Sequence, residues 1–260
     1  MMSSTFRERR RFDVGRVFEL TFGAIGANGL PLLLIAFLFV GIPQAALAWG
    51  QSTMLGRTGT DTFLGLAALV WLGGLFLSMV CSVLMQGVVT HTVVADLQGR
   101  KTSLGESLGV ALRSFWVLLG IGIVSGLAMM LGLILLVVPG ILIFLIWMVA
   151  GPVAIAERTG VGRALSRSRI LTRDHRWWLL LIAVIYFAVS WVLGLIAGMV
   201  SVALGGFDPD STLNVASLII GPAVQALSTL IWGAMVAAAY VELRSVKEGG
   251  GKESVAAIFD

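Results

Sequence analysis

The stretch ERTGVGRALSRSRILTRDHRWW, residues 157–178, carries six arginines between two apolar runs. Arginine runs of this kind are typical of nucleic-acid-binding helices, of phosphate sites and of helices that lie on a membrane surface. The rest of the chain decides between these classes. Of its 260 residues 58% are hydrophobic and only 12% are charged, and the mean hydropathy is +0.97. Because soluble domains carry about 25% charged residues, we predict an integral membrane protein.

Apolar runs on both sides of this stretch are long enough to cross a bilayer, since a spanning helix needs about 20 residues. Six such runs occur, at about 30–49, 63–94, 114–138, 141–156, 177–204 and 215–241. Only Pro139-Gly140 stands between the third run and the fourth, and this turn-forming pair predicts a tight hairpin. The predicted fold is all-α, a polytopic membrane helical bundle with six transmembrane helices within residues 30–243.

The lysines and arginines are confined almost entirely to one side of these six crossings. Of the 18, Arg57 alone falls in a connection on the opposite side. Because basic loops resist translocation across a membrane, we predict that both termini lie in the cytoplasm. Residues 1–29 then form a cytoplasmic N-terminal segment and residues 244–260 a cytoplasmic tail. The tripeptide ALA at 46–48 is typical of a signal-peptide end, but 29 residues precede the apolar run, so we expect no cleavage there.

Short sequences recur along the chain at one fixed spacing. VGR occurs at 14–16 and 161–163, and LLLIA at 32–36 and 179–183. Amphipathic patterns with helical periodicity also precede the first, third and fifth apolar runs. They lie within 1–29, 103–113 and 160–176. We therefore predict three repeats, each an amphipathic interfacial helix followed by two spans.

The third amphipathic segment combines a basic side with an apolar side. Its basic side carries Arg163, Arg167, Arg169, Arg173 and Arg176. The opposite arc gathers Val161, Ala164, Leu165, Ser168, Leu171 and Thr172. Each basic residue near an anionic leaflet contributes about 1 kcal/mol of binding free energy, and tryptophans such as Trp177 prefer the interface. Membrane lipids with anionic headgroups are therefore the predicted partners.

The same arginines also suit a protein partner. A second copy of the chain or another membrane protein could dock on them, and this alternative stays open. No nucleic-acid recognition motif accompanies the arginines, so we expect no nucleic-acid partner.

Residues 151–181, GPVAIAERTGVGRALSRSRILTRDHRWWLLL, resemble the signature of the glycerophosphoryl diester phosphodiesterase membrane-domain family, bacterial six-span proteins of largely unknown function. The matching positions are Pro152, Glu157, Ala164, Arg167, Ser168, Leu171 and Trp178. Arg169-Ile170 stands where that family usually has a tryptophan. The resemblance implies a multi-pass protein of the bacterial inner (cytoplasmic) membrane. The catalytic phosphodiesterase domain for which the family is named has no counterpart in this sequence.

The chain offers few groups for catalysis or metal binding. Phosphodiester hydrolysis needs a cluster of carboxylates and histidines around a metal, or a nucleophile with a base. The two histidines, His91 and His175, stand apart from any such cluster, and Cys81 is the only cysteine. Asp208–Ser211 is more typical of a turn than of a calcium site. We therefore predict no catalytic residue, no metal site, no cofactor and no enzymatic activity.

Polar and helix-breaking residues within the apolar runs suggest a second hypothesis. Gln86 and Gln225 are the most polar side chains at depth and are candidates for lining a cavity, although an interhelical hydrogen bond explains them more simply. Gly151-Pro152 and Gly221-Pro222 resemble the kinks of transporter helices. The main hypothesis is a non-catalytic membrane protein that binds lipid or organises partner proteins at the cytoplasmic leaflet. The alternative is a transporter or lipid-translocating protein that uses the kinked fourth and sixth spans.

Overall fold

The computed structural model describes residues 12–55, 61–205 and 215–259, and within them all regular structure is helical. Arg57 and the Asp208–Ser211 turn lie outside the described residues. Six of the described segments are long and apolar enough to cross a membrane: Gly29–Gly50, Trp71–Leu97, Leu104–Leu135, Val137–Ala156, Arg176–Leu204 and Leu218–Glu248. The predicted all-α, six-span fold is confirmed. The chain is a multi-pass membrane protein.

Helix α1 (Val14–Ala27) lies in the N-terminal segment and precedes the first span. Asp13 caps it, because its Oδ1 accepts a hydrogen bond from the Gly15 N–H at 2.8 Å and satisfies one of the donors that a helix start leaves free. One face of α1 is buried, through Val17, Thr21 and Ala24. This face packs against α10 (Val215–Phe259), so the amphipathic pattern is used for protein packing.

The first span contains a widened helical turn ahead of a proline. Helix α2 (Gly29–Ala36) continues through a π-helical turn, η1 (Phe37–Gly41), into α3 (Ile42–Leu55). Pro43 has no N–H to donate, and its ring crowds the carbonyl four residues earlier. The wider π turn immediately before Pro43 relieves this crowding and lets the chain continue across the membrane.

The second repeat differs from the prediction. Helix α4 (Asp61–Leu97) is followed by α5 (Leu104–Leu135), which Ser103 caps by accepting the Glu106 N–H at 3.2 Å. The separate interfacial helix predicted at 103–113 is wrong, because these residues form the first turns of α5 itself. No proline interrupts residues 104–135, so the hydrogen-bond ladder propagates through Ser114 directly into the apolar run.

The predicted hairpin is present, but its turn lies before Pro139-Gly140. Leu136 alone, in an extended conformation, separates α5 from α6 (Val137–Trp147). Pro139 is tolerated in the first turn of α6 because its missing N–H would have no partner there. The two helices approach very closely: a Cβ added to Gly132 would lie 2.9 Å from the Cα of Gly140.

A side chain at position 132 is therefore expected to force the hairpin apart. Replacing Gly132 by valine should lower the free energy of unfolding by about 1–3 kcal/mol, the usual range for an overpacked site. Thermal unfolding of the purified protein in detergent measures the change. Gly126→Val is the matched control on the same helix, because nothing lies within 4 Å of a Cβ at Gly126. Equal melting temperatures for the two variants would contradict the close approach.

The remaining helices complete the fourth span and form the third repeat. A short helix α7 (Ala150–Ala156) follows α6, then α8 (Val161–Thr172) and the long helices α9 (Arg176–Gly205) and α10. The two predicted proline kinks behave differently. The fourth span is interrupted between α6 and α7, just before Pro152, whereas α10 runs without a break through Pro222.

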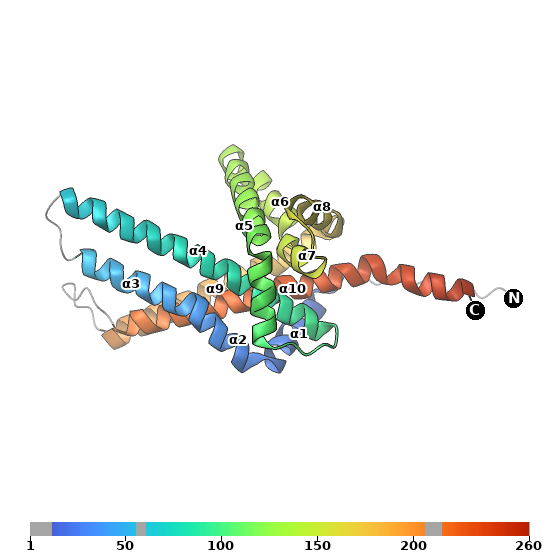
Figure 1. The fold of residues 1–260 in the computed structure, drawn as a ribbon, viewed down its shortest axis with the longest axis horizontal. Coiled ribbons are helices and arrows are strands. Elements are labelled where there is room, and N and C mark those ends of the chain that lie inside the picture. Colours follow the sequence, from blue (N-terminus) through green and yellow to red (C-terminus); the bar gives the residue numbers. More distant parts are fainter. Residues whose placement is uncertain (1–11, 56–60, 206–214, 260) are drawn as a thin grey trace.

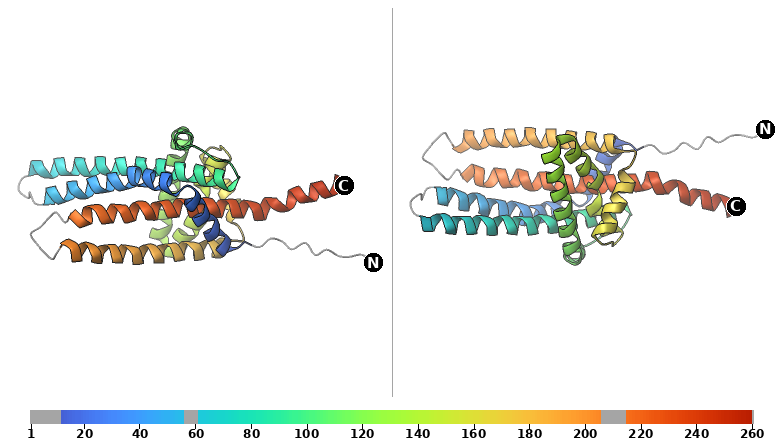
Figure 2. Two further views of the ribbon diagram at one scale, coloured as in Figure 1. Left: turned by 90° about the horizontal axis from the view of Figure 1, so that it is seen from below. Right: turned by 90° about the horizontal axis from the view of Figure 1, so that it is seen from above.

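Figures 1 and 2 show that the six spans do not form one parallel bundle. Helices α3, α4 and α9 and the first half of α10 extend to the same side of the molecule, while α5 and α6 run across them. The second half of α10 extends to the opposite side of the molecule, toward the C-terminus. A Cβ at Gly87 of α4 would lie 2.8 Å from the Cβ of Ala111, so the glycine allows α5 to cross α4 closely.

The buried core lies where these helices meet. It includes Met85 and Val88 of α4, Val149 and Ala150 around α7, and Ala234–Tyr240 of α10. The outer halves of the spans are exposed and apolar, as shown by Trp71, Phe76, Ile134, Leu135 and Trp191. Exposed apolar surface of this extent is unsuited to water but suits contact with lipid chains. The basic end is the end of the molecule at which α7, α8 and the second half of α10 come together.

Candidate lipid-facing site on helix α8

Helix α8 packs one face onto the core and presents the other outward. Ala164, Ser168, Leu171 and Thr172 are buried, and they belong to the arc that the helical periodicity predicts. Gly160 precedes the helix, and Asp174 adopts a left-handed conformation with φ of 75° where the chain turns into α9. The turn allows α9 to start only a few residues after α8 ends.

The break in the fourth span forms the surface on which α8 packs. Helix α6 ends at Trp147, so its last carbonyls lack the intrahelical donors that a continuing helix would supply. Ser168 Oγ donates a hydrogen bond to the carbonyl oxygen of Ile146 at 2.7 Å, and Thr172 Oγ1 donates to the same oxygen at 3.4 Å. Two hydroxyls of α8 therefore satisfy a carbonyl that the break sets free.

Two glutamates from different parts of the chain form ion pairs with Arg167. Glu157, which follows α7, accepts from Arg167 Nε at 3.3 Å and from the Tyr240 hydroxyl at 3.2 Å. Arg167 also pairs with Glu248 of α10, and Arg244 Nε lies 2.8 Å from the other oxygen of Glu248. The charge of Arg167 is thus neutralised within the protein, and α7, α8 and α10 are connected.

Helix α10 also contacts the C-terminal end of α8. Lys247 Nζ donates to the carbonyl oxygen of Ile170 at 2.6 Å and lies 3.8 Å from an Asp174 carboxylate oxygen. A lysine at this position satisfies one of the last free carbonyls of the helix and complements its dipole. Helix α8 is therefore held along its buried face, at Arg167 and at its C-terminal end.

The five arginines predicted to bind headgroups divide into two groups. Arg163, Arg169 and Arg173 are exposed, and their side chains have no ion pair or hydrogen bond among the described residues. Arg167 is 31% exposed and paired as described above. Arg176 is half-buried, and its Nε has no hydrogen-bond partner in the described part of the chain. The structure thus leaves three arginines free to bind an anion.

Comparison with known proteins places the chain in a family. One family model matches residues 12–243, and its description is a domain of unknown function, DUF7847. The chain belongs to the DUF7847 family. No curated protein and no solved structure matches it. The likeness to the glycerophosphoryl diester phosphodiesterase membrane-domain family stays a prediction, because the DUF7847 description carries no function.

The DUF7847 match contains α8 together with Ile146, Glu157 and Tyr240, but it ends at position 243, before Lys247 and Glu248. Sequence reasoning missed these two residues and Tyr240. The only local signal was the four-residue spacing of Tyr240, Arg244 and Glu248, which places them on one helix face. Nothing local indicates that this face meets α8.

The positions matched to the phosphodiesterase membrane-domain signature prove to be structural within the DUF7847 fold. Pro152, Ala164 and Leu171 are buried, Ser168 binds the α6 carbonyl, and Glu157 binds Arg167. Trp178 differs, since it is 49% exposed beside the 80% exposed Trp177. Most of the motif thus builds the joint between α7 and α8, and only Trp178 faces outward.

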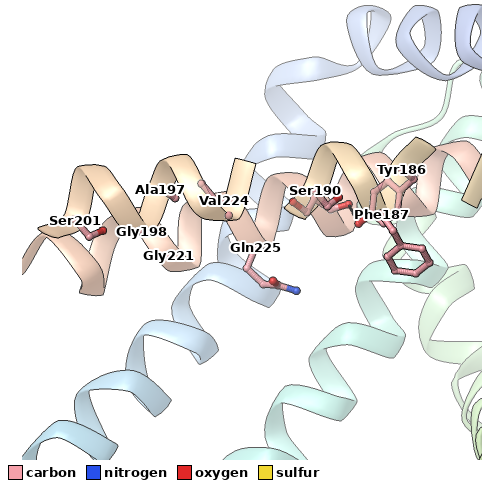
Figure 3. Close-up of a pocket in the computed structure, with 11 residues that line it drawn as sticks. Tyr186, Phe187, Ser190, Ala197, Gly198, Ser201, Gly221, Val224 and Gln225 are labelled. Atoms are coloured by element: carbon pink, nitrogen blue, oxygen red, sulfur yellow. Dashed lines mark hydrogen bonds between the residues drawn. The ribbon is translucent and has the colours of Figure 1, made fainter. Parts of the chain in front are cut away.

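The two glutamines do not meet in one cavity. Gln86 Nε2 lies 3.8 Å from the position of a Cβ on Gly151, so this amide packs between α4 and α7. Gln225 lines a groove between α9 and α10 (Figure 3). The histidines have separate local partners: His91 Nδ1 lies 3.1 Å from Ser107 Oγ, and the His175 ring packs on Phe12. The described residues contain no group of three or more possible metal ligands.

Proposed function

We propose that the protein is a non-catalytic, multi-pass protein of the bacterial inner membrane that binds anionic lipid headgroups on the cytoplasmic leaflet. The site consists of Arg163, Arg169 and Arg173. One observation carries the proposal: α8 is held rigidly while these three guanidinium groups are exposed and unpaired. The other charged residue of the helix, Arg167, is neutralised by Glu157 and Glu248.

The chemistry of the site favours phosphate groups. Guanidinium groups bind phosphate oxygens through paired hydrogen bonds, which a lysine cannot do. Trp177 and Trp178 are exposed at the start of α9, at the level that tryptophan prefers between headgroups and hydrocarbon. Because α8 directly precedes these residues, its exposed arginines are at headgroup depth. At about 1 kcal/mol for each basic residue, the three contribute enough to select anionic lipids.

Charge reversal tests the proposal. The triple variant Arg163→Glu, Arg169→Glu and Arg173→Glu is expected to retain about tenfold less anionic lipid, since screening by salt reduces the full electrostatic gain. Native mass spectrometry of protein released from nanodiscs with phosphatidylglycerol and phosphatidylethanolamine measures the retained lipid.

The matched control reverses three other exposed basic residues, Arg100, Lys101 and Arg113. This control variant has the same net charge as the α8 triple variant. It is expected to retain nearly as much anionic lipid as the wild type does. If both triple variants lose lipid equally, or neither does, the site on α8 is refuted. Loss of a co-purifying protein with unchanged lipid would instead support the partner-docking alternative.

A second candidate function is lipid translocation. Two observations favour it: the interruption of the fourth span between α6 and α7, and the groove beside Gln225 in the sixth. Helix α10, however, runs without a break through Pro222. The fourth and sixth spans are therefore not a matched pair of broken helices of the kind that transporters use. Headgroup binding by α8 is therefore the better-supported function.

A further inference from the structure

A groove of about 540 Å³ runs between α9 and α10 (Figure 3). It extends along α9 from Tyr186 to Ser201, and Gly221 and Gln225 line it from α10. These positions belong to the fifth and sixth spans. The groove therefore lies within the membrane-spanning part of the protein, separate from the exposed arginines of α8.

The groove exists because neither helix carries bulk there. Nothing lies within 4 Å of a Cβ added to Gly194 or Gly198 of α9, or to Gly221 of α10. The inner end is closed, since the Tyr186 hydroxyl donates to the Ser228 carbonyl oxygen at 2.8 Å. The ring of Trp232 covers the same end, 4.7 Å from the ring of Tyr186. Contacts of Tyr186 with Ser228 and Trp232 thus close the groove at one end.

The dimensions of the groove limit what can occupy it. The fifteen-residue step from Tyr186 to Ser201 corresponds to about 22 Å of helix. The volume spread over that length gives a mean cross-section of about 25 Å². A helix is about 10 Å across even at its narrowest, roughly 80 Å² in section. The groove is too narrow to enclose a whole helix, whereas a single extended hydrocarbon chain can lie inside it.

The surroundings of the groove identify the chemistry of the occupant. The neighbouring residues Trp191, Ile196 and Met199 are exposed and apolar, so a lipid phase surrounds the opening. Apart from Tyr186, whose hydroxyl is already bonded, the lining contains no ionisable side chain, and its other polar side chains are Gln225 and three serines. A serine hydroxyl within a helix can bond to a backbone carbonyl one turn earlier and then presents little polarity. The walls therefore suit an uncharged hydrocarbon chain.

We propose that the groove between α9 and α10 is a binding site for one acyl chain of a membrane phospholipid. The site is separate from the headgroup site on α8, because the groove begins ten residues into α9, where Phe187 packs against Phe144 of α6. The protein then has two lipid contacts of different chemistry, one ionic and one apolar.

Photo-crosslinking tests this site. The full-length protein is reconstituted in nanodiscs that contain a phosphatidylethanolamine with a diazirine in its acyl chain, and adducts are mapped by peptide mass spectrometry. Adducts are expected to concentrate on the groove-lining residues of α9 and α10. The variant Gly194→Leu with Gly198→Leu fills the groove and should lower these adducts about tenfold, because added side-chain volume excludes the chain.

The matched control is Gly122→Leu with Gly126→Leu on α5. These glycines also have nothing within 4 Å of an added Cβ but do not line the groove, so groove adducts should be unchanged. Adducts spread evenly over Trp191, Ile196 and the groove, or an unchanged yield in the filled variant, would overturn the acyl-chain site. So would a change from dimer to monomer in the filled variant, because a second copy would then be the occupant.

Each of the two lipid proposals can be refuted without refuting the other. Charge reversal of Arg163, Arg169 and Arg173 should leave the groove adducts unchanged even where it reduces the retention of anionic lipid. The filled-groove variant should retain anionic lipid as the wild type does.

Discussion

Replacing Leu171 by alanine is expected to lower the free energy of unfolding by about 2–5 kcal/mol, the range for deleting a fully buried leucine side chain. Leu171 is completely buried in the face of α8 that packs on the core. Alanine keeps the helical propensity, so the loss arises from the cavity left behind and not from the helix itself. Chemical or thermal unfolding in detergent measures it.

The neighbouring residue is a matched control for this effect. Ile170 is on the same helix and is 53% exposed, so Ile170→Ala should change stability by less than about 0.5 kcal/mol. The Leu171→Ala variant should also show faster proteolysis between α7 and α9, because α8 then packs less firmly on the core. Similar stabilities for the two variants would mean that α8 does not pack on the core as described.

Replacing Arg16 by leucine is expected to destabilise the protein by about 3 kcal/mol. Arg16 Nε lies 3.4 Å from Glu242 Oε2, and the Glu242 side chain is only 3% exposed. Removing one partner of a buried ion pair leaves an uncompensated charge, which typically costs about 3–5 kcal/mol. The lower end applies here because Arg16 is 42% exposed, so water already screens part of the attraction.

The double variant Arg16→Leu with Glu242→Gln separates this charge effect from simple loss of packing. Removing the buried carboxylate charge as well should recover most of the lost stability, since the destabilisation comes from the unpaired charge. Additive destabilisation in the double variant would contradict the explanation. Because α1 contacts α10 through this pair, the single variant should also loosen the N-terminal helix.

The local part of the candidate site could be predicted from the sequence. Periodicity alone assigned Ala164, Ser168 and Leu171 to one arc of α8, and these residues are buried. It also put Arg163 and Arg169 on the opposite side, where both are exposed. Both results depend only on neighbours within a few turns, and a helix fixes the direction of such neighbours.

The partners of Arg167 could not be predicted in this way. From its position on the wheel, Arg167 is equivalent to the arginines that face outward, yet Glu157 and Glu248 neutralise it. Glu248 is distant in the sequence and reaches α8 only because α10 runs unbroken from Val215 to Phe259. An ion pair between distant segments depends on how helices cross, and hydropathy carries no information on crossing.

By itself, the sequence determined the membrane character, the six spans and the orientation of α8 about its axis, since these follow from composition and from periodicity along one helix. Only the tertiary structure decided that α5 and α6 run across the other spans, that Arg167 is paired, and that a groove separates α9 from α10. These features arise where residues far apart in the chain meet. Their geometry is set by the packing of side chains between helices, such as Gly87 against Ala111.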